Sequence, residues 1–213
     1  MLPELNSTNG FIFRITHRNN VPWILDNGLH CRNSKSVDPN FVQIGNADLI
    51  SKRHHKKAKG PYGGTLGDYV PFYFTPLSPM FYNIKTGWNG ITKRANDEIA
   101  ICYSSLDDLA KHGVQFVFTD RHAYLETAQA FTEVSDLKQI DWKILQNRDF
   151  KRDTDDLGKV ERYEAEILVR TLLPVKALRG IACVNASAAA AIKTEVDKRN
   201  LSLPVETKPG WYF

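Results

Sequence analysis

The stretch from Gly63 to Met80 limits what this chain can fold into more than any other part of it. Two neighbouring glycines allow a sharp turn, and the aromatic and β-branched residues from Tyr69 to Phe74 favour a half-buried strand. Pro71 offers no N–H to a neighbouring strand, which predicts an edge strand or a bulge. A buried core strand explains each aromatic residue alone but explains the whole run less well. We therefore expect a strand that is entered from a mobile loop and lies beside a functional site.

The size and charge of the chain limit what this strand can belong to. With 213 residues, 42% hydrophobic and 24% charged, the chain is long enough to bury a core, and its composition is typical of a soluble globular protein. We find no internal repeat and no flexible linker, so we expect one domain over residues 1–213. The formal net charge of +4 and the pI near 8.9 permit a local basic face that binds a polyanion.

The cysteines and the apolar pattern indicate a compartment. Cys31, Cys102 and Cys183 are odd in number and widely spaced, which fits neither a disulfide framework nor a metal site. The first residues lack the positive start and apolar run of a secretory signal, and no apolar stretch is long enough to cross a bilayer. We expect a cytoplasmic protein without membrane association.

Periodicity predicts a mixed α+β domain. Alternation predicts a first strand from Gly10 to Thr16, and the following helix is expected from Val21 to Asn27, capped by Asn20 and stopped by Gly28. Further strands are expected over residues 98–104, 114–119, 163–170, 181–184, 205–207 and 211–213. Helices are expected after Ser78, over 106–112 and over 187–199, and 148–160 is expected to be exposed and mobile. Residues 32–46 predict a long loop, which in a compact domain is often functional.

The one basic cluster of the chain lies between Ser51 and Gly60, with five formal positive charges and two histidines. Such a cluster is either a solvated helix end or mobile loop, or a contact to phosphates. The paired histidines alone do not predict zinc, because the cluster contains no Cys, Asp or Glu to complete a ligand set. Both interpretations of the charge stay open at this point.

Two strand ends carry polar groups of the kind that build sites. Asp120, Arg121 and His122 follow a predicted strand, although a single histidine is more often structural. Alternation from Tyr163 to Arg170 places Glu164 and Glu166 on one face of a strand. These carboxylates either protect a sheet edge or act as a catalytic acid and its neighbour.

Several of these segments together resemble a known enzyme family. Arg14 to His17, Tyr73 to Thr75 and the Glu-Ala-Glu run ending at Glu166 resemble the three-part site of ADP-ribosyltransferases, which bind NAD between two small sheets. More specifically, Gly63 to Met80, Phe116 to His122 and Glu161 to Glu166 resemble DarT, the DNA ADP-ribosyltransferase toxin family of bacterial toxin–antitoxin pairs. The resemblance covers nearly the whole chain, with several long motifs in the same order.

The resemblance implies a fold and a reaction. The expected fold is a split central β-sheet with flanking helices and a mobile loop that covers NAD. The expected reaction transfers ADP-ribose from NAD, as co-substrate and without a metal, to a base in single-stranded DNA, with nicotinamide released. The Phe-Thr-Asp-Arg-His motif is similar to that of members that modify thymine at its ring nitrogen. The implied partner is a macrodomain antitoxin of the DarG type that reverses the modification.

The resemblance also implies which residues catalyse the reaction and which contact NAD and DNA. Glu166 is the expected catalytic carboxylate, because breaking the nicotinamide–ribose bond leaves positive charge on the sugar. Arg53, expected on the covering loop, acts at the acceptor base. Because a guanidinium has no lone pair, we expect Arg53 to stabilise the deprotonated thymine while His122 or water takes the proton. The residues implied to contact NAD are Arg14 (a histidine in some members), Ile15, Thr16, Trp23, Cys31, Arg53 and Tyr73, and those implied or proposed to contact DNA are Met80, Tyr82, Arg121, His122, Lys56, Lys57 and Lys59.

Other function classes stay open on the sequence alone. One alternative is a related ADP-ribosyltransferase that acts on guanine in DNA, on RNA or on protein. Another is a nucleic-acid-binding module without enzymatic activity that uses the basic cluster from Lys52 to Lys59.

Overall fold

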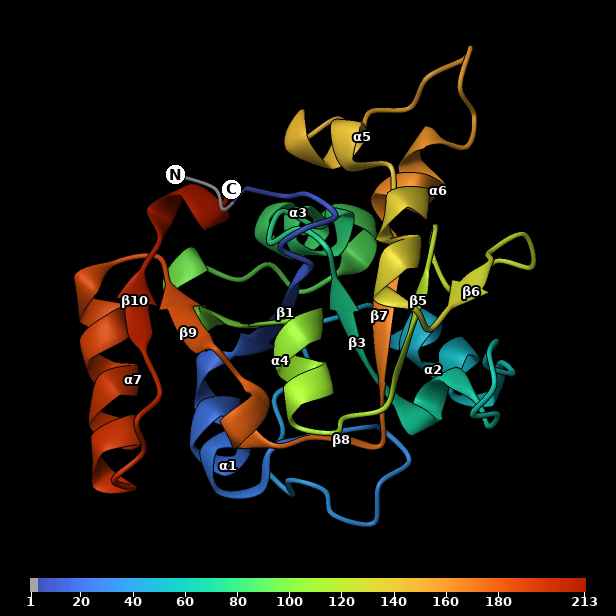
Figure 1. Ribbon diagram of the computed structural model, residues 1–213. Helices are drawn as coiled ribbons and strands as arrows, with labels where there is room; N and C mark the ends of the chain where they lie inside the picture. The colour runs from blue at the N-terminus through green and yellow to red at the C-terminus, as the bar shows by residue number, and fades with distance from the viewer. Residues whose placement is uncertain (1–3) are drawn as a thin grey trace.

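The computed structural model describes residues 4–213, so the first three residues of the expected domain lie outside the described part. Helices and strands alternate irregularly along the chain, as expected for an α+β fold (Figure 1). The helices are α1 (Val21–Asn27), α2 (Ala47–His55), α3 (Pro79–Thr86), α4 (Leu106–Lys111), α5 (Trp142–Gln146), α6 (Lys159–Tyr163) and α7 (Ala186–Lys198).

Within residues 4–213 the strands form one large sheet of eight strands and a small antiparallel pair. The order in the large sheet is β10-β9-β4-β1-β3-β7-β5-β6, and β2 pairs with β8. The strands are β1 (Phe11–His17), β2 (Leu29–His30), β3 (Tyr69–Tyr73), β4 (Ile99–Ser105), β5 (Phe116–Thr119), β6 (Ala130–Phe131), β7 (Glu166–Arg170), β8 (Leu172–Leu173), β9 (Gly180–Cys183) and β10 (Val205–Thr207).

The sheet is split between β1 and β3. β1 pairs with β4 along its whole length, and β3 pairs with β7 along its whole length. β1 and β3, in contrast, meet only at the pair Phe13–Tyr73. Beyond that pair the two halves separate, and Arg14 bridges the gap by donating a hydrogen bond from its Nη1 to the Pro71 carbonyl at 2.8 Å. This confirms the split-sheet fold that the sequence motifs predicted.

The split also explains why Pro71 is tolerated inside the sheet. β3 is a central strand with a continuous register to β7, so the prediction of an edge strand or a bulge was wrong. The N–H and C=O of one residue in a strand point to the same side, and the Pro71 carbonyl points to the β1 side. β1 and β3 pair only at Phe13–Tyr73, so no β1 carbonyl is placed to accept a hydrogen bond from residue 71. The N–H that proline lacks therefore costs the sheet no hydrogen bond.

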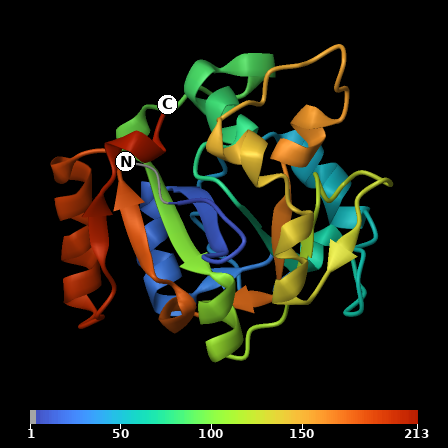
Figure 2. The same cartoon turned by 45° about the horizontal axis from the view of Figure 1, so that its top comes forward.

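Helices cover the two halves of the sheet separately. Figure 1 shows α7 and α1 beside the β10–β9–β4–β1 half, whereas α2 lies beside the β3–β7–β5–β6 half. Figure 2 shows residues 148–158 projecting as a long loop between α5 and α6. One core cluster runs through both halves, since it contains Ile12 of β1 as well as Phe72 of β3.

Several predicted elements differ from the structure in detail. Residues 211–213 do not form a strand: Trp211 packs edge-on against the Phe13 ring, and the Tyr212 hydroxyl donates to the Ile99 and Ala182 carbonyls. The last long helix is capped by Asn185 rather than Ser187. β6 and α6 were not predicted, because elements of two and five residues are too short to show periodicity.

Candidate active site

A buried carboxylate lies at the start of β7. Glu166 is 1% exposed, and its two side-chain oxygens accept a paired hydrogen bond from Arg53, Nη1 to Oε1 at 2.8 Å and Nη2 to Oε2 at 2.7 Å. Oε1 also accepts the backbone N–H of Ala123 at 3.0 Å. Tyr73 on β3 is the register partner of Glu166, so this strand pair carries both groups. The carboxylate is thus held by hydrogen bonds from two separate segments, α2 and the chain after β5 that contains Ala123.

The charges around Glu166 keep it ionised. Burial acts to raise the pKa of Glu166, but the charge of Arg53 and the hydrogen bonds from Arg53 and Ala123 outweigh it and lower that pKa. Burial acts to lower the pKa of Arg53, and the Glu166 carboxylate reverses this and raises it. Arg53 therefore stays a cation here and cannot itself accept a proton.

His122 faces the same carboxylate. Its Nε2 lies 3.7 Å from Glu166 Oε1, and its Nδ1 accepts the backbone N–H of Tyr124 at 3.2 Å. Burial lowers the pKa of His122, with the Glu166 charge opposing that shift, so the neutral ring is favoured. Because Nδ1 is an acceptor, the neutral ring carries its hydrogen on Nε2, toward Glu166. In this arrangement the protonated Nε2 faces the carboxylate at 3.7 Å and has no lone pair with which to accept a proton.

Glu164, two residues before Glu166, belongs to the same electrostatic site. It is the C-cap of α6 and precedes β7, so the prediction that both carboxylates share one face of a strand was wrong. Burial and then the negative charge of Glu166 raise the pKa of Glu164 to about 7, while the Arg53 charge opposes the shift. Near neutral pH this carboxyl exchanges its proton readily.

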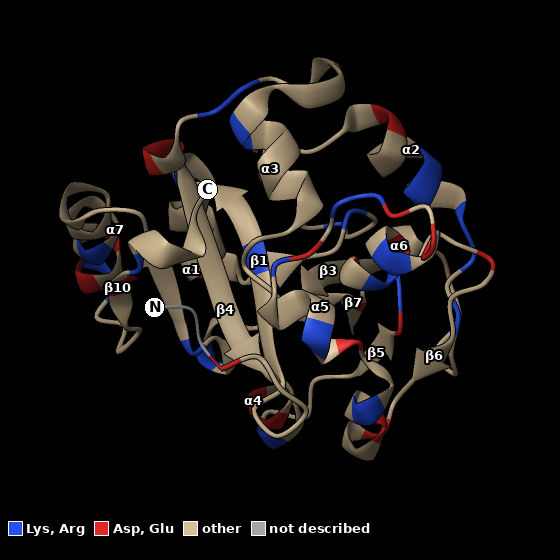
Figure 3. Ribbon diagram, turned by 90° about the horizontal axis from the view of Figure 1, so that it is seen from above, with Lys and Arg blue, Asp and Glu red and all other residues tan. Residues whose placement is uncertain are grey.

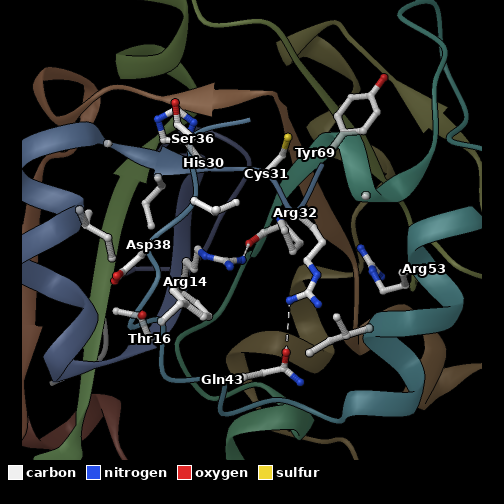
Figure 4. Close-up of a pocket in the computed structure, with 18 of the residues that line it drawn as sticks. Arg14, Thr16, His30, Cys31, Arg32, Ser36, Asp38, Gln43, Arg53 and Tyr69 are labelled. Atoms are coloured by element: carbon white, nitrogen blue, oxygen red, sulfur yellow. Dashed lines mark hydrogen bonds between the residues drawn. The ribbon is translucent and has the colours of Figure 1, made fainter. Parts of the chain in front are cut away.

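A cavity of about 280 Å³ opens where the two halves of the sheet separate. Arg14 and Thr16 project into it from β1, and Arg53 reaches it from α2 (Figure 4). Trp23 and Cys31 also line it. Six further lining residues come from residues 32–46, the long loop that the sequence predicted to be functional: Arg32, Ser36, Val37, Asp38, Phe41 and Gln43.

The residues predicted to contact NAD therefore divide into two groups. Arg14, Thr16, Trp23, Cys31 and Arg53 line the cavity. Ile15 and Tyr73 do not. Ile15 is buried in the core, as alternation along β1 requires. Tyr73 lies next to Glu166 instead, where burial and then the Glu166 charge raise its pKa well above the usual range.

The cavity suits a ligand with phosphate or hydroxyl oxygens. The Nε of Arg14 is shielded from solvent and has no hydrogen-bond partner among residues 4–213, so a bound acceptor would satisfy it. Burial lowers the pKa of Arg14, and the side chains that act on that pKa, Cys102, Tyr73 and Arg53, include no carboxylate. Trp23 and Phe41 add flat apolar surface, and His54, Gln43 and Tyr69 line the cavity although the sequence did not single them out.

The residues predicted to contact DNA come from α3, from the chain after β5 and from the basic cluster. Arg121 pairs with Asp120 at 3.0 Å and lies 3.9 Å from Glu161. Tyr82, 42% exposed, packs edge-on against Phe150 and Phe213. Met80 lies in the first turn of α3 and packs against the core.

The basic cluster forms the last turns of α2 and the segment after it, which appear in blue in Figure 3. Arg53 thus lies on a helix, and its predicted place on a covering loop was wrong. Lys56 donates to the Glu126 carboxylate, whereas Lys59 donates to the Glu126 and Ala128 carbonyls. Lys57 is exposed.

No helix among residues 4–213 is long and apolar enough to cross a membrane. Likewise, the described residues contain no group of three or more His, Cys, Asp or Glu side chains placed to hold a metal ion.

Comparison with known proteins identifies the family. The model of the family described as "ssDNA thymidine ADP-ribosyltransferase, DarT" matches residues 13–213. The chain belongs to the DarT family. A DarT-family DNA ADP-ribosyl transferase of Escherichia coli O127:H6 (strain E2348/69 / EPEC) is 50% identical over 210 residues, which cover 99% of this chain and 96% of that protein.

Solved DarT structures match the fold over its full length. Thermus sp. 2.9 DarT in complex with ADP-ribosylated ssDNA superposes with a TM-score of 0.89 at 29% identity, covering 100% of both chains. The same protein in complex with NAD+ gives a TM-score of 0.82 at 29% identity, again over 100% of both chains. These matches confirm the predicted fold class and the predicted DarT resemblance.

Proposed function

We propose that this chain, as a DarT-family ADP-ribosyltransferase, transfers ADP-ribose from NAD to the ring nitrogen of thymine in single-stranded DNA and releases nicotinamide. The family membership and the relatives bound to NAD+ and to ADP-ribosylated ssDNA support this reaction. The observation that carries the proposal for these residues is the buried Glu166 carboxylate, held by the Ala123 N–H and by Arg53, which also lines the cavity proposed for NAD.

Glu166 is proposed to act on the sugar of NAD. Breaking the nicotinamide–ribose bond leaves positive charge on the ribose, and a fixed carboxylate stabilises that charge without reorganising. A carboxylate has about four acceptor positions. Three are used by two Arg53 N–H groups and the Ala123 N–H, so one remains for a sugar hydroxyl.

Arg53 and His122 are proposed to act at the acceptor base. Thymine must lose its ring proton before the nitrogen attacks the sugar, and the Arg53 cation stabilises the resulting anion. His122 or water takes the proton. The contact of His122 Nδ1 with the Tyr124 N–H favours water as the acceptor, with His122 keeping Glu166 in place.

NAD is proposed to occupy the cavity in the sheet split. Arg14 and Thr16 lie where they can hold the ribose and phosphate oxygens, with Trp23 and Cys31 on the wall. Ile15 can reach the ligand only through its backbone, and Tyr73 only from the Glu166 side. The loop over residues 32–46 is proposed as the cover of the cavity, and its predicted mobility stays a prediction. No metal is required by this scheme.

Single-stranded DNA is the proposed macromolecular substrate, reached through Met80, Tyr82, Arg121 and the lysines after α2. A base held in a duplex cannot present its ring nitrogen, so single strands should react faster. We also propose a separate antitoxin of the DarG type. A relative from Thermosipho africanus (strain H17ap60334), 23% identical over 206 residues, is a DNA ADP-ribosyl transferase-DNA ADP-ribosyl glycohydrolase fusion protein. We also propose that the chain forms a single catalytic domain and acts in the cytoplasm. The three free cysteines in residues 4–213 support the cytoplasmic location.

The proposal is tested with labelled NAD and matched acceptors. Single-stranded oligonucleotides that differ at one base, their duplex forms, an RNA strand and a protein mixture are each incubated with the enzyme, and products are read by mass spectrometry. We expect one ADP-ribosyl group on the thymine strand, an equal amount of nicotinamide, and less product on duplex. Product on guanine, RNA or protein alone would contradict the proposal.

A further inference from the structure

Two lysines after α2 hold the segment that follows His122. Lys56 donates to the Glu126 carboxylate and its ammonium lies 5.2 Å from the centre of the Tyr124 ring. Lys59 donates to the Glu126 carbonyl and, at 2.7 Å, to the Ala128 carbonyl. We call Lys56, Lys59 and Glu126 the lysine clasp.

The clasp lies next to the reacting groups. Arg53 and Lys56 are separated by one helical turn, and His122 and Glu126 are joined by a short turn. Arg53 and His122 both face Glu166. The lysines therefore follow one active-site residue in the chain, and Glu126 follows another. A nucleotide whose base is at Glu166 would therefore place a neighbouring phosphate near the clasp.

The backbone that carries the two lysines is fixed. The Ala58 N–H donates to the Gly64 carbonyl at 2.9 Å, and the Leu66 N–H donates to the Lys56 carbonyl at 2.8 Å. Ala58 itself is 5% exposed and packs in a small core with Leu66 and Tyr69. The lysines are therefore presented from a built support and not from a free loop.

The Glu126 side chain, in contrast, is 81% exposed. An exposed ion pair contributes little to stability, and its carboxylate regains full hydration when it leaves. A carboxylate and a phosphate present the same kind of anionic oxygen, but a phosphodiester is tethered to the rest of the bound strand. DNA can therefore compete with the Glu126 carboxylate for the Lys56 ammonium, while the Lys59 ammonium is held beside it by the Glu126 and Ala128 carbonyls.

We propose that Lys56 and Lys59 bind a phosphate of the single strand beside the acceptor base, and that Glu126 occupies that phosphate position until DNA displaces it. This inference rests on the proposed function, since it concerns DNA as substrate. The alternative is that the clasp only braces the segment from His122 to Ala128, in which case Glu126 supports the active site and does not compete with DNA.

The two roles differ in their effect on DNA affinity. We compare wild type, Glu126→Gln, Lys56→Gln and the double variant by fluorescence anisotropy with a labelled single strand, without NAD, over a series of salt concentrations. Glu126→Gln should tighten DNA binding by about two- to five-fold, the range expected when a competing exposed ion pair is removed. Lys56→Gln should weaken DNA binding and reduce the magnitude of the salt slope by about 0.7, one phosphate contact.

The double variant is the decisive comparison. With Lys56 removed, Glu126 has little left to compete for, so Glu126→Gln should change DNA affinity much less in the Lys56→Gln background. Glu133→Gln is the matched control for net charge, because Glu133 is exposed and its carboxylate accepts a hydrogen bond from the neighbouring Thr132 hydroxyl. It should leave DNA affinity close to that of wild type.

Several results would overturn the inference. Glu126→Gln with unchanged or weaker DNA binding would do so, as would a lower kcat at unchanged KM for DNA, which indicates a brace. An equal gain in Glu133→Gln would show a general charge effect. If wild type itself neither bound nor modified single-stranded DNA, the proposed function would fail first, so the two failures are distinguishable.

Discussion

Removing Arg53 should destabilise the protein in a way that depends on pH. Glu166 is 1% exposed and the Arg53 side chain 12% exposed, so Arg53→Ala leaves a buried carboxylate without its counter-charge. Breaking one side of such a pair costs about 3–5 kcal/mol. The Ala123 N–H and His122 still face Glu166, so we expect the lower end, about 3 kcal/mol, or roughly 6–12 °C in Tm for a domain of this size.

The sign of the pH dependence separates this cause from a general packing loss. In wild type the pKa of Glu166 is lowered, so its contribution to stability is present above its unfolded pKa and is lost as pH falls through the folded value. In Arg53→Ala, burial without a partner raises that pKa, so stability is present below the unfolded value and is lost as pH rises. The deficit of the variant relative to wild type should therefore shrink from about pH 8 to about pH 5.

The assay is urea unfolding of wild type, Arg53→Ala, Glu166→Gln and the double variant at both pH values. The double variant removes both charges, so it should be less destabilised than the sum of the single variants by about 2–3 kcal/mol. An Arg53→Ala deficit below about 1 kcal/mol, or the same deficit at both pH values, would refute the reasoning.

Three further predictions address the rest of the site. Glu164→Gln should lose less stability than wild type as pH rises from about 5 to about 8, because the wild-type carboxyl, with a pKa raised to about 7, must ionise in a buried place. If the free energy of urea unfolding changed equally with pH in both proteins, this prediction would be contradicted. Arg14→Gln should raise the KM for NAD about ten-fold at nearly constant kcat, if Arg14 binds ground and transition states alike; steady-state kinetics with an unchanged KM for NAD would remove Arg14 from the NAD site. His122→Gln keeps a donor toward Glu166, so kcat should fall by only about ten-fold, whereas a loss of about a hundred-fold or more would make His122 the proton acceptor.

Much of the fold could be predicted because its longer elements carry strong local signals. β1 alternates cleanly, α1 lies between Asn20 and Gly28, and β4 is a continuous apolar run. Gly28, at φ +86°, has the backbone conformation that stops a helix and that other residues rarely adopt. The Pro71 prediction failed because sequence cannot show that two neighbouring strands touch at one pair and then separate.

The side chains of the site that belong to sequence motifs could be predicted, whereas their partners outside the motifs could not. Motifs placed Glu166, Arg53 and His122 in one function, and the structure brings all three together. The Ala123 N–H donor could not be predicted, because any residue supplies a backbone N–H and only its position makes it useful. The lysine pairing with Glu126 was missed as well, since an exposed glutamate carries no signal of which distant lysine it meets.

The central claim is that the carboxylate of Glu166 drives ADP-ribose transfer. The most direct measurement is the initial rate of thymine modification on one single-stranded oligonucleotide, read by mass spectrometry, for Glu166→Gln and for Glu164→Gln as its matched neighbour. Glu166→Gln keeps the shape of the side chain and removes its charge, so the rate should fall by about a hundred-fold or more, while Glu164→Gln keeps most activity. A folded Glu166→Gln protein that modifies thymine at a rate near wild type would contradict the account.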